Sequence, residues 1–133
     1  MKLARFQVET EARAQVLLVR KQVDKALSQL EAGDGLAHLW CPHTTAGLTV
    51  NEGWDPDVTT DLLGRLEALV PWNAAYRHAE GNSAAHIKAA LIGPGVTVPV
   101  EGGQLALGRW QDVYFCEFDG PRRRTIEVRY IGD

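Results

Sequence analysis

Three of the four histidines in this chain of 133 residues lie in polar stretches that contain glycine. His43 lies within residues 42–47, while His78 and His86 flank the polar residues 80–83. Imidazole groups next to hydroxyl and carboxylate groups can hold a metal ion, bind an anion or transfer a proton. The sequence therefore predicts that these three histidines, contributed by separate segments, converge in a functional site.

A divalent metal ion is one ligand that this set could hold. Zinc with three protein ligands and one open position would use His43, His78 and His86 together, with water or substrate as the fourth partner. The spacing between His78 and His86 matches no standard metal motif, and magnesium is the alternative to zinc. The metal interpretation thus depends on the fold bringing the three residues together.

A phosphate group is the alternative ligand, and it needs no metal. Asn82 or Ser83 caps a predicted helix that runs to residue 92 and ends at the Gly-Pro-Gly run 93–95. The first turn of this helix offers free backbone N–H groups to an anion, and its positive end favours a neutral His86. The predicted substrate- or phosphate-binding residues are Thr44, Thr45, Arg77, Asn82 and Ser83.

Two carboxylates are candidates for proton transfer. Asp55 and Pro56 are typical of a helix start, and an apolar stripe that includes Leu69 continues this helix until residue 71. Asp57 and Asp61 are four residues apart, so both project from the same helix face. One of them could face the histidines and act with His78 as a catalytic acid or base; the alternative is a solvated acidic edge.

The remaining segments indicate strands and one further helix. Residues 3–9 and 14–19 are predicted to form a hairpin around a turn at 10–12, with a helix from residue 11 as the competing interpretation. A surface helix is predicted over 21–31. Further strands are predicted at 36–41, 48–51, 96–100, 104–118 and 124–131, the last two forming a hairpin through 119–121. His38, in the middle of the 36–41 strand, is interpreted as a core or strand histidine satisfied by a backbone group, and Trp110 as a core or interface aromatic.

These elements predict a single compact α+β domain over residues 1–133, with a largely antiparallel sheet and about three helices. A net charge of −3 and a pI of about 5.8 argue against a nucleic-acid binder, and the basic run at 122–124 is interpreted as a solvated strand end. Cys41 and Cys116 are expected to be buried free thiols, which favours the cytoplasm. No run of residues is long and apolar enough to predict a signal peptide or a membrane span. Walker-type loops, dinucleotide fingerprints and Gly-x-Ser-x-Gly nucleophiles are absent from the sequence.

Several short blocks, in order along the chain from about residue 36, resemble the YjbQ-type family, whose members are also described as secondary thiamine-phosphate synthases. The first third of the chain is only weakly matched. The blocks that carry the resemblance are His43 to Leu48, Asn51-Glu52, Asp55-Pro56-Asp57 with Asp61-Leu62, Tyr76-Arg77-His78, Gly81-Asn82-Ser83 with His86-Ile87-Lys88, Leu107-Gly108 with Trp110-Gln111, and Glu117 to Arg122.

The resemblance implies a homotrimer with a histidine-rich site near the subunit boundary. It also implies a side activity that joins a pyrimidine diphosphate to a thiazole phosphate, with a small phosphorylated metabolite as partner. Helix N-termini, the histidines, a divalent ion and Arg77 or Arg122 could stabilise the departing diphosphate. A zinc-dependent hydrolase and a non-catalytic metal- or metabolite-binding module are the alternatives. Arg109 departs from the family, which usually has a small hydroxyl residue there, so substrate preference could differ.

Overall fold

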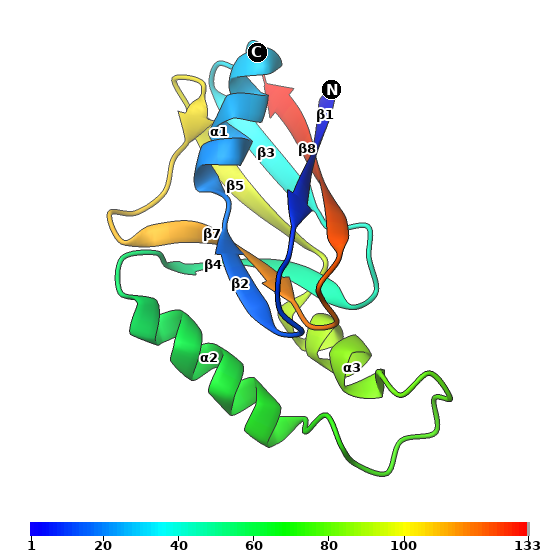
Figure 1. Ribbon diagram of the computed structural model, residues 1–133. Helices are drawn as coiled ribbons and strands as arrows, with labels where there is room; N and C mark the ends of the chain where they lie inside the picture. Colours follow the sequence, from blue (N-terminus) through cyan, green and yellow to red (C-terminus); the bar gives the residue numbers. More distant parts are fainter. Residues whose placement is uncertain (133) are drawn as a thin grey trace.

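The computed structural model describes residues 1–132, in which eight strands form two antiparallel sheets and three helices pack against them (Figure 1). The five-stranded sheet has the order β1-β8-β3-β5-β6, and the three-stranded sheet has the order β2-β7-β4. The strands are β1 (Lys2–Glu9), β2 (Gln15–Leu18), β3 (Gly35–Trp40), β4 (Ala46–Glu52), β5 (Gly95–Glu101), β6 (Gln104–Leu105), β7 (Gln111–Glu117) and β8 (Arg123–Gly132). The helices are α1 (Arg20–Gln29), α2 (Pro56–Leu69) and α3 (Ser83–Ile92). The predicted α+β class, with antiparallel strands and three helices, is confirmed.

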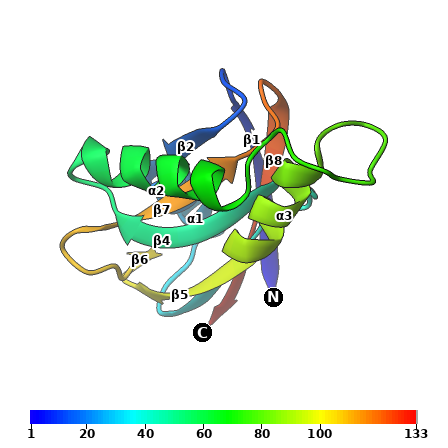
Figure 2. The same ribbon diagram turned by 90° about the horizontal axis from the view of Figure 1, so that it is seen from below.

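β7 is the middle layer of the molecule because both of its faces are covered. Val113 and Phe115 belong to the larger hydrophobic core. Tyr114 and Cys116 point the other way, into a smaller core that also contains residues of α2 and α3. A strand buried on both faces has a nearly continuous apolar sequence rather than an alternating one, which is what residues 113–116 show. Figure 2 shows α2 and α3 lying across this three-stranded sheet.

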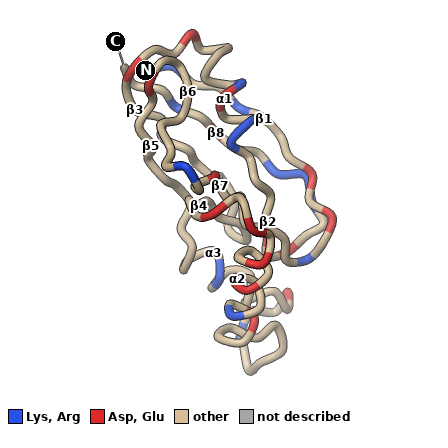
Figure 3. Tube along the Cα trace, turned by 90° about the vertical axis from the view of Figure 1, so that its left-hand side faces the viewer, with Lys and Arg blue, Asp and Glu red and all other residues tan. Residues whose placement is uncertain are grey.

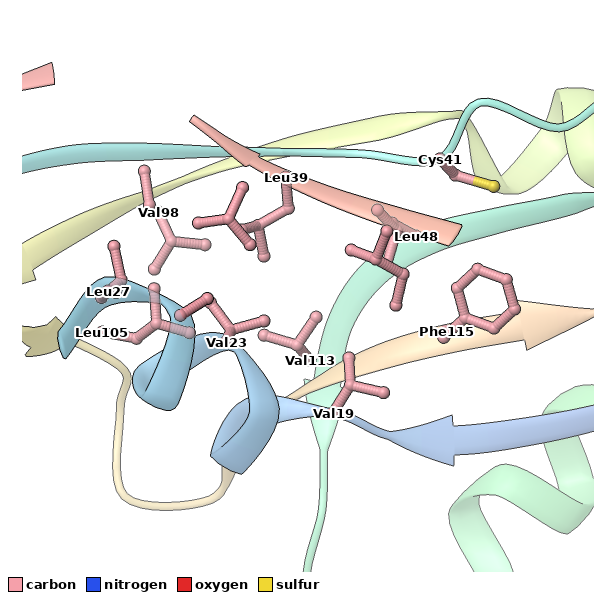
Figure 4. Packing of buried hydrophobic residues seen from close by; sticks show 14 of the residues in the cluster. Val19, Val23, Leu27, Leu39, Cys41, Leu48, Val98, Leu105, Val113 and Phe115 are labelled. Atoms are coloured by element: carbon pink, nitrogen blue, oxygen red, sulfur yellow. The ribbon is translucent and has the colours of Figure 1, made fainter. Parts of the chain in front are cut away.

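The larger core fills the space between the two sheets and α1 (Figure 4). Val23 and Leu27 of α1 are fully buried against it, at the helical spacing that the sequence predicted. Burying one such side chain contributes about 1.5–3 kcal/mol. The side chains labelled in Figure 4 are Val19, Val23, Leu27, Leu39, Cys41, Leu48, Val98, Leu105, Val113 and Phe115.

α2 begins as predicted but packs less extensively than predicted. The Asp55 side chain accepts a hydrogen bond from the Asp57 backbone N–H at 2.9 Å, and Pro56 occupies the first turn. Leu66 is the one buried residue of α2 and retains 7% exposure. Leu69, which the predicted stripe included, is exposed. α2 therefore covers one face of the three-stranded sheet and packs against it along one side of the helix.

Both predicted hairpins are wrong. β1 pairs with β8 and β2 pairs with β7, so residues 10–14 carry the chain from one sheet to the other. β7 and β8 also lie in different sheets, so residues 118–122 are a second crossing between sheets. The predicted strand 104–118 is interrupted at 106–110 and forms β6 and β7. Local turn signals cannot distinguish a hairpin from a crossing, because both need the same turn residues.

The structure places His38 and Trp110 outside the hydrophobic cores. His38 is not a core residue: it is half-buried on β3, and its Nδ1 lies 2.9 Å from the Thr97 hydroxyl rather than from a backbone group. Its ring stacks on Trp40. Trp110 is exposed and packs edge-on against Trp54 at 5.7 Å between ring centroids. Cys41 and Cys116 are buried free thiols, as predicted.

Charged residues of both signs are distributed over the sheets and helices. In Figure 3, Lys and Arg are interspersed with Asp and Glu along the trace. Among residues 1–132, none of the helices combines the length and the apolar character that a membrane span requires.

Candidate functional site

A polar pocket of about 350 Å³ lies where three irregular segments meet. These segments are the bend between β3 and β4, the start of α3 with the residues before it, and the crossing between β7 and β8. The residues that line the pocket are Pro42, His43, Thr44, Thr45, Glu80, Asn82, His86, Asp119, Arg122 and Arg124. Three segments that are far apart in the sequence thus build one site.

Close packing places α3 beside this pocket. The carbonyl of Gly93, which ends α3, accepts the backbone N–H of Leu48 in β4 at 3.0 Å. A Cβ atom on Gly47 would lie 2.6 Å from that Gly93 carbonyl oxygen, so a side chain at residue 47 would push α3 away from β4. The buried Lys88 ammonium of α3 also pairs with Glu67 of α2 at 2.6 Å. The helix that carries His86 is therefore held by both β4 and α2.

The structure brings most of the predicted binding residues to the pocket. His43, His86, Thr44, Thr45 and Asn82 all line it. His78 does not line it, but its ring packs edge-on against His86, with the ring centroids 5.2 Å apart. His78 and His86 are therefore neighbours, and His86 lines the same pocket as His43.

Other predicted site residues lie elsewhere. Asp57 and Asp61 are exposed on α2 and do not line the pocket, so this chain does not bring either carboxylate to the histidines. Arg77 lies in the segment between α2 and α3 and does not line the pocket either. Ser83 is the first residue of α3, next to the pocket residue Asn82. The acidic groups that the pocket does contain are Glu80 and Asp119.

The pocket residue Arg124 forms a buried ion pair with Glu117, which lies behind the pocket lining. Glu117 is 0% exposed at the end of β7, and Arg124 is 5% exposed at the start of β8. The Arg124 Nε donates to Glu117 Oε1 at 2.8 Å, and its Nη2 donates to Glu117 Oε2 and, at 2.8 Å, to the Thr45 hydroxyl. Burial alone would raise the pKa of Glu117, but hydrogen bonds from Arg124, the Asp119 backbone and Thr10 outweigh it and lower the pKa below its usual value.

His43 is held in its neutral form. Its Nε2 accepts the Thr125 backbone N–H at 2.9 Å, which places the proton of the neutral ring on Nδ1. Burial lowers the pKa of His43 below its usual value, and the positive charge of Arg124 lowers it further. Nδ1 makes no hydrogen bond within residues 1–132 and is not a buried atom, so it is free to donate. In this state His43 can donate a hydrogen bond through Nδ1, whereas its acceptor nitrogen, Nε2, is already occupied.

Asn82 contributes an unsatisfied acceptor. Its Nδ2 donates to Asp119 Oδ2 at 2.9 Å, and the same carboxylate oxygen accepts from Arg122 Nη2 at 3.1 Å. The Oδ1 of Asn82 is the one buried side-chain N or O atom in residues 1–132 without a partner. Asn82 precedes α3 but makes no side-chain cap hydrogen bond; its Nδ2 group instead joins α3 to Asp119.

The residues of a single chain do not fit the predicted three-histidine metal site. Within the described part of the chain, no group of three His, Cys, Asp or Glu side chains could hold a metal ion. The Nε2 of His43 is already engaged by the Thr125 N–H, and the Nε2 of His78 lies 3.7 Å from Glu80 Oε2. The donors that do converge here, with arginine and threonine among them, favour an anion.

The sequence interpretation named one arginine of the pocket, Arg122, but missed the other, Arg124. Residues 122–124 were interpreted as a solvated strand end, which is wrong for Arg124, because it is buried and paired with Glu117. One signal was present in the sequence: Glu117 follows an apolar strand, and a carboxylate at such a position requires a buried partner. Asp119 was missed because crossing segments give no periodic pattern.

The comparisons with known proteins agree with this fold. Residues 4–133 match the family described as UPF0047 protein YjbQ-like. The UPF0047 protein YugU of Bacillus subtilis is 44% identical over 131 residues, which cover 98% of this chain and 99% of that protein.

Two solved structures are also similar over nearly the whole chain. A crystal structure of a YjbQ/UPF0047 family protein from Clostridium acetobutylicum has a TM-score of 0.93 and 45% identity, covering 96% of this chain and 99% of that chain. A hypothetical protein from Aeropyrum pernix has a TM-score of 0.95 and 38% identity, with full coverage of both chains. By sequence and by fold, the chain belongs to the YjbQ-like UPF0047 family.

Proposed function

We propose that the pocket binds a small phosphorylated metabolite and that the protein is a group-transfer enzyme acting on it. The observation that carries this proposal is the convergence of hydrogen-bond donors on one pocket from three separate segments. His43, Arg122 and Arg124 are among its residues, and the start of α3 adds backbone N–H groups. Donors of this kind match the oxygens of a phosphate or diphosphate.

The reaction that we propose follows from the family resemblance: a pyrimidine diphosphate is joined to a thiazole phosphate. The thiazole nitrogen forms a bond to the pyrimidine methylene carbon, and the bond from that carbon to the diphosphate oxygen breaks, with its electron pair leaving on the diphosphate. Donors positioned around that oxygen would stabilise the developing charge. The Nδ1–H of neutral His43 and the α3 N–H groups are suited to this role. His86, supported by His78, would contact the departing group beside them.

An assay of turnover tests this proposal directly. Purified protein is incubated with the pyrimidine diphosphate and the thiazole phosphate, and formation of thiamine phosphate is followed by chromatography. We expect slow product formation that saturates with both substrates. Stabilisation of the protein against melting by these compounds, without product, would instead identify a non-catalytic binding module.

We propose that a divalent ion, if one takes part, enters with the diphosphate rather than residing on three histidines. Magnesium commonly binds through substrate phosphates and one or two carboxylates, and Glu80 and Asp119 line the pocket. Elemental analysis of the purified protein is therefore expected to find less than one zinc per chain, both for wild type and for His86→Ala. One tightly bound zinc per chain that is lost in His86→Ala would contradict this and favour a zinc-dependent hydrolase.

We propose that the protein is a homotrimer. Support comes from the resemblance and from large apolar side chains that a single copy leaves exposed, such as Trp40, Trp54, Leu91 and Ile131. Light scattering coupled to size exclusion is expected to give three times the chain mass of 14.6 kDa, with no change on tenfold dilution. A mass that corresponds to one chain across concentrations would contradict the trimer.

A further inference from the structure

We propose that Arg124 binds the substrate anion through its Nη1 group and that Glu117 is the positioning residue that holds the guanidinium in place for this contact. This inference rests on the proposed function of the pocket and adds a specific anion ligand to it. It concerns a residue that the sequence interpretation assigned to the solvent.

Two of the three guanidinium nitrogens of Arg124 are already committed. Nε donates to Glu117 Oε1 at 2.8 Å. Nη2 donates to Glu117 Oε2, to the Thr45 hydroxyl at 2.8 Å and to the Thr45 carbonyl at 3.4 Å. Nη1 makes no hydrogen bond within residues 1–132. One end of the planar group is therefore fixed, and the other end is free.

The free nitrogen is not enclosed by protein, and it belongs to a residue that lines the pocket. Nη1 is not among the buried side-chain atoms without a partner in the described part of the chain, so it is reachable from solvent. Arg124 as a whole is only 5% exposed, and it lines the pocket. The small accessible part of this buried residue therefore faces the cavity where the ligand would lie.

Glu117 cannot easily rotate away from Arg124, because both oxygens of its carboxylate also accept hydrogen bonds from other groups. Besides Arg124, Oε1 accepts the Thr10 hydroxyl at 2.8 Å, and Oε2 accepts the backbone N–H groups of Phe118 at 3.1 Å and Asp119 at 3.0 Å. A guanidinium clamped in this way is oriented before the ligand arrives, so little side-chain entropy is lost on binding. Its burial also strengthens the interaction with an anion.

Arg122 offers a contrast within the same pocket. Its side chain is 53% exposed and is tied to Asp119 through Nε and Nη2. An exposed arginine gains little from an ion pair, because water screens the charge. We therefore expect Arg124 to contribute more to anion affinity than Arg122, although Arg122 is the easier of the two to reach.

Calorimetric titration with pyrophosphate tests this assignment. Arg124→Lys keeps a positive charge beside Glu117 but removes Nη1, and we expect it to weaken pyrophosphate binding by about tenfold or more. Arg20→Lys is the matched control. Arg20 lies at the start of α1 and pairs with Asp24, so we expect this substitution to leave the affinity for pyrophosphate unchanged. Circular dichroism and melting temperature establish that each variant is folded.

The outcomes separate this inference from the proposed function. If wild type binds no pyrophosphate, the anion-binding pocket itself is wrong and Arg124 has no ligand role. If wild type binds and folded Arg124→Lys binds equally well, only the role of Arg124 is overturned.

A measurement on the wild-type protein covers the case in which Arg124→Lys does not fold. In arginine-selective NMR, the guanidinium resonances of Arg124 are expected to shift on saturation with pyrophosphate, while those of Arg20 stay in place. Unchanged Arg124 resonances at saturation would overturn the inference, because a purely structural ion pair would not respond to the ligand.

Discussion

Turnover in the coupling assay is expected to fall about 10²–10³-fold when His43 is replaced by alanine, which is the usual effect of removing one donor to a developing negative charge. The neutral ring presents its Nδ1–H, because Nε2 accepts the Thr125 N–H. Removing a donor that acts only as charge develops should lower kcat more than it raises KM. The measurement is steady-state kinetics for both substrates.

His38→Ala is the matched control for this variant. His38 lies on β3, outside the pocket, and contacts Thr97 and Trp40. We expect its kcat and KM to equal those of wild type. Equal losses in both histidine variants would point to a general effect of histidine removal on folding or assembly. A wild-type rate in His43→Ala would remove His43 from the chemistry.

The free energy of unfolding is expected to fall by about 3–5 kcal/mol in Glu117→Ala, because this variant leaves the Arg124 guanidinium buried without its counter-charge. Such a loss is a large part of the stability of a domain of this size, about 5–15 kcal/mol. Glu9→Ala is the control, since the Glu9 side chain is 70% exposed and its pair with Arg123 is solvated; we expect a loss of less than about 1 kcal/mol. Urea denaturation measures both values.

The contribution of Glu117 to the free energy of unfolding should also depend on pH and decrease in acid. The fold lowers the pKa of this carboxyl, so the stabilisation is complete above the usual glutamate pKa of about 4.3 and is lost as the pH falls through the lower, folded-state value. The difference in stability between wild type and Glu117→Gln should therefore shrink on acidification below that pH. A difference that stays constant down to the acid limit of folding would show that the carboxylate charge is not what stabilises the fold.

The helices and most strands were predictable from the sequence because their signals are local. The Asp55-Pro56-Asp57 start of α2 and the Gly93 end of α3 are capping signals, and both lie where they were predicted. The pairing of strands was not predictable in the same way. The paired residues of β1 and β8 are more than 100 positions apart in the sequence, as with Glu9 and Arg123, and no turn residue indicates such a partner.

The site was predictable to the extent that its residues have unusual chemistry. Histidines, threonines and a helix start directed attention to residues 43–45 and 82–86, and these segments do line one pocket. Arg124 was missed because a run of three arginines is usually solvated, which holds for Arg122 and Arg123 but not for Arg124. Asp57 and Asp61 do share a helix face, but α2 presents that face to solvent, and only the three-dimensional packing decides this.

A crystal structure of the wild-type protein grown with pyrophosphate tests the central claim most directly. We predict density for the anion in the pocket between His43, the start of α3 and Arg124, with a pyrophosphate oxygen within hydrogen-bond distance of Arg124 Nη1. Pyrophosphate bound away from these residues, or an empty pocket in crystals grown at saturating pyrophosphate, would contradict the account.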